Sequence, residues 1–104
     1  MVGEIKMKNI KKLIEYPNEG ILSKEILKND KIDVTLFCMA AGTEIDDHTS
    51  TRSGFVSVVD GKGMFNLEGT DIEMVNGVFI PMEENAVHNL KAEENTSFVL
   101  VLSK

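Results

Sequence analysis

The chain has 104 residues, a hydrophobic fraction of 42% and a formal net charge of −6 at pH 7. This length fits one domain with its own core, and the apolar fraction is too high for a disordered chain. The acidic balance, with no basic run after Lys12, argues against nucleic-acid binding because phosphate contacts need clustered Lys and Arg. No apolar run is long enough to span a bilayer, which argues against a membrane protein.

The start of the chain and its single cysteine predict a cytoplasmic protein. The first residues, Met-Val-Gly-Glu-Ile-Lys, lack the apolar stretch of a signal peptide. One cysteine without an intrachain partner fits a reducing compartment. Cys38 lies in an apolar strand, so it is interpreted as a small buried hydrophobe, with a reactive or metal-bound thiol as the alternative.

The elements begin with a short helix. Residues 8–16 carry apolar Ile10, Leu13 and Ile14 at helical spacing, and Pro17 to Gly20 end the segment. Residues 1–20 are therefore predicted to form an N-terminal helix or arm, and residues 21–104 the main domain.

From Ile21 onward the pattern predicts strands. Two strands, 21–28 and 32–40, are separated by a polar turn, and the second becomes apolar on both faces, as expected beneath another layer. Glycine turns follow at even spacing, and they indicate hairpins: Asp60-Gly61, Glu68-Gly69 and Asn76-Gly77. The predicted strands after these turns are residues 64–67, 72–75, 78–81, 86–92 and 96–103. Many short strands without a later helix favour an all-β sandwich or barrel.

The two histidines of the chain, His48 and His88, carry a resemblance to a known superfamily. Gly42, His48 and Gly61 have the spacing of the first cupin motif, while Pro81 and His88 match the second in kind. From Ile21 to the C-terminus the chain resembles the small single-domain cupins. The resemblance implies an all-β double-stranded β-helix, the jelly-roll barrel of RmlC-like proteins, here preceded by a short N-terminal helix.

The motifs depart from the pattern at half of the positions that bind metal in cupins. The resemblance implies a site of three histidines and one carboxylate that holds iron, nickel, manganese or zinc. Here Ser50 occupies the second histidine position and Gly54 the glutamate position. The segment between Pro81 and His88 is two residues longer than the motif and lacks its glycine. His48 and His88 are therefore candidate ligands of a partial site.

Other side chains could complete such a site. Strand alternation gives Asp46 and Glu44 the same face as His48 and turns Asp47 away. Cys38 is a further candidate, and Glu83 and Glu84 lie in the enlarged segment before His88. The alternative interpretation of these acids is a solvated rim, since Asp and Glu are mostly exposed.

The residues around the missing ligands predict an apolar cavity. If Gly54 faces inward, Val56 and Val58 do so too, and with Ser50 they would line a pocket suited to a small hydrophobic molecule.

The opposite face predicts a subunit contact. Phe55 and Val59, together with Phe37 and Met39, would then form an exposed apolar patch, which predicts a homodimer.

Three functions remain open at this point. The first is a small cupin protein of unassigned activity that binds a small molecule in its barrel, with a partial or absent metal site. The second is a metal-dependent dioxygenase or isomerase that uses His48 and His88 with non-standard further ligands. The third is a structural dimer module. The motif supplies fewer donors than a metal site needs, which favours the first, and no catalytic residue is identified.

Overall fold

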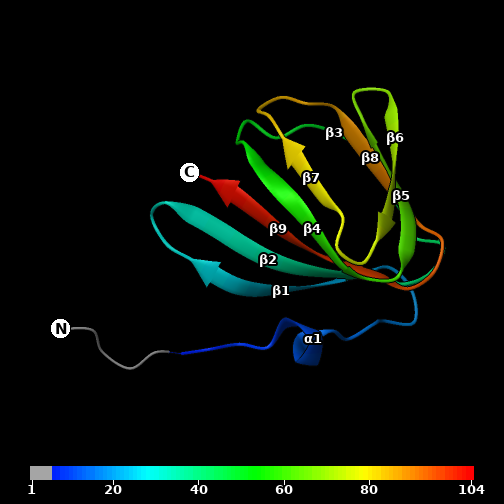
Figure 1. The fold of residues 1–104 in the computed structure, drawn as a ribbon, viewed down its shortest axis with the longest axis horizontal. Helices are drawn as coiled ribbons and strands as arrows, with labels where there is room; N and C mark the ends of the chain where they lie inside the picture. The colour runs from blue at the N-terminus through cyan, green and yellow to red at the C-terminus, as the bar shows by residue number, and fades with distance from the viewer. Residues whose placement is uncertain (1–5) are drawn as a thin grey trace.

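The computed structural model describes residues 6–104, so the first five residues of the predicted arm lie outside the described part. Within it, one short helix and nine strands are arranged as two antiparallel sheets that face each other (Figure 1). The predicted all-β class with a short N-terminal helix is confirmed.

The strands alternate between the two sheets in the manner of a jelly roll. The large sheet contains, in spatial order, β1 (Ile21–Lys28), β2 (Ile32–Met39), β9 (Thr96–Ser103), β4 (Gly54–Asp60) and β7 (Phe79–Met82). The small sheet contains, in spatial order, β3 (Glu44–His48), β8 (His88–Ala92), β5 (Lys62–Leu67) and β6 (Thr70–Val75). All the strand pairs within these sheets are antiparallel.

The predicted glycine turns are present, but only Glu68-Gly69 forms a hairpin, between β5 and β6, whereas Asp60-Gly61 and Asn76-Gly77 connect strands of different sheets. Gly61, Gly69 and Gly77 have φ values of +94°, +85° and +96°, which residues with a side chain rarely adopt. Gly61 is also sterically constrained, because a Cβ there would lie 2.0 Å from the carbonyl oxygen of Asn95. The chain can therefore pass directly from β4 in one sheet to β5 in the other.

The core lies between the inner faces of the sheets. Its buried apolar members are Met39, Val56, Val58, Phe65, Met74, Ile80, Met82, Leu90, Ala92 and Phe98. Phe37 packs against this cluster, and its ring stacks on that of Phe98 with centroids 5.3 Å apart. The prediction that Phe37 and Met39 form an exposed patch was therefore wrong. Both faces of β2 are apolar, so alternation alone could not tell which face is inside.

The N-terminal segment covers part of the outer face of the large sheet. Its helix α1 (Ile10–Leu13) is shorter than the predicted 8–16, because the backbone is already extended at Ile14. The Asn9 side chain caps this helix by accepting from the Lys12 amide at 3.4 Å. Lys24 of β1 then donates to the Leu13 carbonyl at 2.9 Å, which fastens the segment to the sheet. Within residues 6–104, no helix is both long and apolar enough to cross a membrane.

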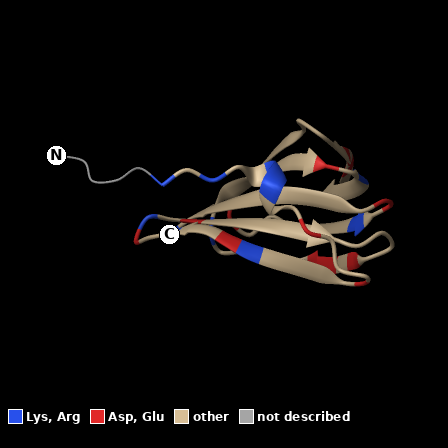
Figure 2. Cartoon of the chain, turned by 90° about the horizontal axis from the view of Figure 1, so that it is seen from below, with Lys and Arg blue, Asp and Glu red and all other residues tan. Residues whose placement is uncertain are grey.

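Charged residues are spread over the surface of the molecule. In the view of Figure 2, acidic and basic residues are interspersed along strand ends and loops, and the basic residues of α1 are Lys11 and Lys12.

Tyr16 makes the innermost polar contact of the N-terminal segment. Its hydroxyl donates to Asp60 Oδ2 at 2.7 Å and lies 3.1 Å from Ser97 Oγ. Ser97 and its cross-strand neighbour Cys38 are both fully buried. Burial disfavours the phenolate and, assisted by the Asp60 charge, raises the pKa of Tyr16 to about 12.

We predict that Tyr16 ionises near pH 12 in the folded protein, against 10.0 in the unfolded chain. The stability gained by burying the neutral phenol is then fully present below pH 10 and lost as the pH rises towards 12. Tyr16 is the single tyrosine and tryptophan is absent, so tyrosinate absorbance reports this residue alone. Circular dichroism on the same samples shows whether the fold persists, and a midpoint near 10 in the folded protein would contradict the docked segment.

Candidate ligand cavity at the histidine pair

The fold brings the two histidines together. His48 ends β3, His88 begins β8, and the two residues are cross-strand partners. Their ring centroids are 3.9 Å apart and the ring planes are inclined by 59°. The sequence motifs therefore mark one location in the structure.

A β-bulge in β3 sets the direction of the His48 side chain. The register of β3 against β8 shifts between Ile45 and His48. Both side chains border the cavity between the sheets although they are three residues apart, and His48 remains exposed. The predicted parity of Glu44 and Asp46 with His48 was therefore wrong, because an extra residue at a bulge reverses the alternation.

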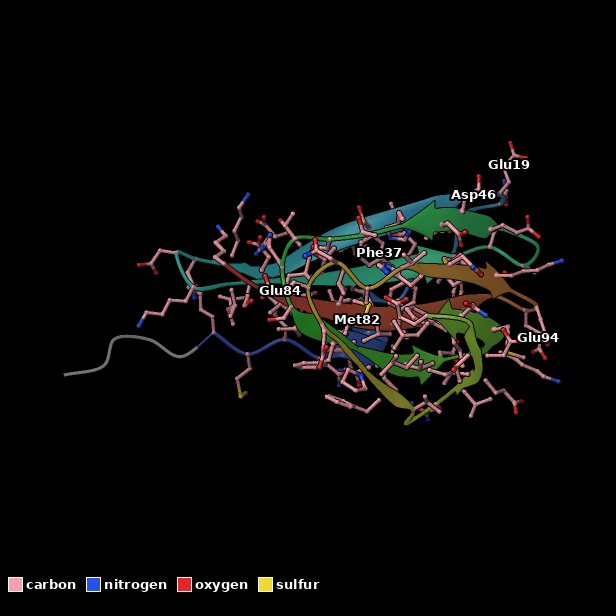
Figure 3. All side chains as sticks on the ribbon, turned by 90° about the horizontal axis from the view of Figure 1, so that it is seen from above. Glu19, Phe37, Asp46, Met82, Glu84 and Glu94 are labelled. Carbon is pink, nitrogen blue, oxygen red and sulfur yellow. The ribbon has the colours of Figure 1, made fainter. Side chains whose placement is uncertain are left out.

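The acids of β3 lie on the outer side of the small sheet. Glu44 pairs with Lys91, with the Oε1 and Nζ atoms 3.4 Å apart. Asp47 Oδ1 accepts from Asn89 Nδ2 at 2.7 Å, and Asp46 projects away from the barrel (Figure 3). These three carboxylates line an open groove on the outer face rather than the space beside the histidines.

Backbone carbonyls fix the orientation of both imidazoles. His88 Nδ1 lies 3.1 Å from the Ala86 carbonyl oxygen, and His48 Nδ1 lies 3.0 Å from that of Asp46. A carbonyl oxygen can only accept, so each Nδ1 carries the hydrogen, and in a neutral imidazole Nε2 then keeps its lone pair. Among the described residues, neither Nε2 has a hydrogen-bond partner.

His88 is the buried member of the pair. It is 7% exposed, and its ring lies parallel to Phe65 with a centroid distance of 5.6 Å. Burial lowers the pKa of His88, with a smaller contribution in the same direction from His48. His88 is thus a neutral acceptor at physiological pH.

A clamp around Val87 positions His88. The Glu68 amide donates to the Val87 carbonyl at 2.9 Å, and the Val87 amide donates to Glu68 Oε1 at 3.0 Å. Glu68 adopts a φ of +50°, which lets one residue make both contacts. Sequence reasoning treated Glu68 only as part of a turn and gave no signal for this contact.

The histidine pair lies at a small apolar cavity of about 130 Å³ between the sheets. Its lining consists of Phe37, Ile45, His48, Val56, Phe65, Met82, His88, Leu90, Phe98 and Leu100. Figure 3 shows Phe37 of β2 and Met82 of the edge strand β7 in the interior. Of the residues predicted for the cavity, Val56 is in this lining, and Val58 is in the adjoining core.

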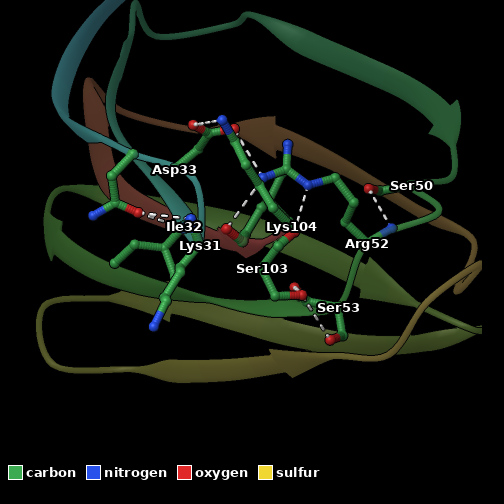
Figure 4. Close-up of polar contacts among 10 residues, drawn as sticks. Lys31, Ile32, Asp33, Ser50, Arg52, Ser53, Ser103 and Lys104 are labelled. Carbon is green, nitrogen blue, oxygen red and sulfur yellow. Dashed lines mark hydrogen bonds and ion pairs between the residues drawn. The ribbon is translucent and has the colours of Figure 1, made fainter.

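Ser50 is turned towards its own loop. Its Oγ accepts from the Arg52 amide at 3.1 Å, and its carbonyl accepts from the Asn85 amide at 2.7 Å. Arg52 holds the loop by pairing with Asp33 at 2.8 Å and donating to the Leu102 carbonyl at 3.2 Å (Figure 4). The hydrogen bond from Arg52 lowers the pKa of Asp33. Ser50 is not among the residues that line the cavity.

Gly54 cannot carry a side chain in this backbone. A Cβ at this position would lie 1.8 Å from the carbonyl oxygen of Val101 on the neighbouring strand β9. A glutamate there would require β4 and β9 to separate. The absence of a carboxylate at the position that cupin metal sites use therefore follows from the strand packing.

The donor set does not fit the metal site that the resemblance implies. Cys38 lies on the outer side of the large sheet beside Ser97, on the opposite face of β2 from Phe37. Throughout residues 6–104, no three His, Cys, Asp or Glu side chains are grouped so that they could hold a metal ion. The cavity offers two imidazoles, whereas metal sites use three or four donors.

Comparison with solved structures places this arrangement in a known fold. A conserved protein of unknown function from Streptococcus pyogenes is 21% identical, with a TM-score of 0.85 over 99% of this chain and 90% of that one. A cupin superfamily protein from Desulfitobacterium hafniense is 14% identical, with a TM-score of 0.86 over 98% and 94%. A salicylate 1,2-dioxygenase mutant from Pseudoaminobacter salicylatoxidans is 16% identical, with a TM-score of 0.75 over 80% and 26%.

These likenesses define a double-stranded β-helix barrel. The chain therefore has the barrel fold of small cupin domains, as its two motifs implied. No protein-family model and no curated protein matches the sequence. Because the fold is shared by enzymes and by proteins without an assigned activity, it assigns no reaction to this chain.

We predict that Gly54→Ala lowers the free energy of unfolding by about 3 kcal/mol or more, because the added methyl meets backbone that cannot rotate away. Gly77→Ala is the matched control. The methyl added at Gly77 would meet no atom within 4 Å, so the expected loss in free energy of unfolding is only that of an alanine at positive φ, about 1 kcal/mol. Urea denaturation measures both losses, and equal losses would contradict the close approach of β4 and β9.

Proposed function

We propose that this protein binds a small, largely apolar molecule in the cavity between its sheets, with His48 and His88 as the polar end of the site. The observation that carries the proposal is an apolar cavity lined by two imidazoles, neither of whose Nε2 atoms has a hydrogen-bond partner among the described residues. Binding pockets combine predominantly apolar walls with a few placed polar groups in the same way.

The size of the cavity limits the ligand to roughly one ring. An apolar cavity of about 150 Å³ in another protein stays dry and takes up benzene, and this cavity of about 130 Å³ is comparable. Eight of its ten lining side chains are apolar, so a bound ring would make dispersion contacts with most of the wall.

Metal-dependent catalysis is the second candidate. Its support is the histidine pair itself, since metal-binding histidines commonly hold one ring nitrogen on a backbone carbonyl, as both do here. Against it stands the donor set: Gly54 excludes a side chain, Ser50 is turned to Arg52, and the acids of β3 are on the outer face. A dioxygenase or isomerase would need a further ligand from outside the described residues.

We predict that benzene raises the melting temperature of the protein and that Val56→Leu abolishes this effect by filling the cavity. A ligand at 100 times its Kd stabilises the native state by about 2.7 kcal/mol. Val99→Leu is the matched control, because Val99 is half-buried and does not line the cavity. Thermal denaturation with increasing benzene measures the shift in all three proteins.

Two results would contradict this function. One is the absence of a benzene-dependent shift in the native chain. The other is near-stoichiometric iron, nickel, manganese or zinc in protein purified without a histidine tag, if the metal is lost in His48→Ala and His88→Ala. That second result would favour the metal-dependent candidate.

We further propose a cytoplasmic homodimer. The free, buried Cys38 suits a reducing compartment. Support for self-association comes from an apolar pair on the large sheet, where Phe79 is 58% exposed and its ring stacks on Phe55 with centroids 4.7 Å apart. Of the residues in the predicted patch, Phe55 is part of the proposed contact. Phe37 and Met39 lie in the interior instead, and Phe79 takes their place in the contact. Large exposed apolar groups of this kind commonly mark subunit contacts.

We predict that Phe79→Ser converts the dimer to a monomer without unfolding it, because the removed ring is largely exposed. Val75→Ser is the matched control, since Val75 is also an exposed apolar residue but lies on β6 of the small sheet. Light scattering at micromolar concentration measures the mass. A monomer mass for the native chain would overturn the dimer.

A further inference from the structure

We infer that the cavity selects small, uncharged molecules that carry a hydroxyl hydrogen on an apolar body, the chemistry of a simple phenol. This inference rests on the proposed function and adds the class of ligand. It follows from the polarity of the two histidines, from the absence of fixed charge in the lining and from the size of the space.

The polar end of the cavity accepts hydrogen bonds and does not donate them. Each Nδ1–H is already directed at a carbonyl oxygen, at 3.0 Å for His48 and 3.1 Å for His88. Moving the hydrogen to Nε2 would place a lone pair of Nδ1 against the lone pairs of that carbonyl. The other lining residues are Phe, Ile, Val, Leu and Met, which offer no N–H or O–H donor from their side chains. A ligand therefore gains a hydrogen bond here if it carries an N–H or O–H donor, and gains none if it carries only an acceptor.

The lining disfavours ligands of either charge. Among the described residues that line the cavity, none is Lys, Arg, Asp or Glu. A carboxylate would present its oxygens to the lone pairs of Nε2 and would find no cation. An ammonium group would find an acceptor but no counter-charge, and removing it from water would be costly. An uncharged donor avoids both costs.

The position of His88 makes the donor contact selective. His88 is 7% exposed and its ring is held parallel to Phe65, so few water molecules can reach the imidazole. A buried acceptor that faces a methyl group instead of a hydroxyl loses its hydrogen bond and receives no replacement from solvent. Polar sites of this kind discriminate against analogues that lack the matching group.

The test compares three probes of similar shape on the full chain at pH 8: phenol, toluene and benzoate. Isothermal titration calorimetry is expected to show phenol binding about tenfold more tightly than toluene, a difference of about 1.4 kcal/mol from one net hydrogen bond. Benzoate is expected to show no binding. In the double variant His48→Leu/His88→Leu the preference for phenol over toluene should fall to about one.

The outcomes distinguish a failure of this inference from a failure of the proposed function. Equal affinities for phenol and toluene in the native chain would overturn the inference and leave an apolar ligand site intact. Tighter binding of benzoate than of phenol would also overturn the inference, because this result would show that the site presents a hydrogen-bond donor or a positive charge. Binding of none of the probes would overturn the proposed function as well. The native-chain comparison is decisive even if the double variant fails to fold.

Discussion

The structure depends on apolar packing between two sheets whose inner faces must meet without leaving buried polar groups unpaired. Phe37, Phe65 and Phe98 occupy the middle of this space, and branched or unbranched aliphatic side chains fill most of the remainder. Protein interiors are packed to crystal-like density, so a cavity of about 130 Å³ beside two imidazoles is an exception in a core of this size. Because this cavity lies where the otherwise apolar interior has two polar side chains, we interpret it as a ligand site.

Backbone geometry determines which side chains border the cavity. The bulge in β3 brings Ile45 and His48 to the same side and leaves the neighbouring acids outside. The approach of Val101 to Gly54 excludes a side chain where cupin metal sites carry a carboxylate. Together with Ser50 at the second histidine position, these two features of the strands reduce the polar content of the cavity to the histidine pair.

The sequence predicted the architecture well because its signals were local. Glycine turns such as Gly61 and Gly69, and the spacing of His48 and His88, were sufficient for the barrel and for most of its strands, although β3 and β4 were not among the predicted ranges. The site was less predictable, since it depends on contacts between segments far apart in the chain. No residue pattern near Asp46 predicts the bulge in β3. The outer face of β2 is also apolar, because it is buried under the N-terminal segment, so the pattern did not indicate which face of β2 is directed inward.

A ligand site of this kind requires both imidazoles to present an unprotonated Nε2 to the cavity. Two-bond proton–nitrogen correlation spectra of the histidine side chains at mildly alkaline pH measure this directly, and His48→Gln assigns the two sets of signals. We expect the tautomer with hydrogen on Nδ1 for both residues, and we expect the nitrogen shift of Nε2 to change when phenol is added. Hydrogen on Nε2 of His88 would contradict it, because the site would then be a donor.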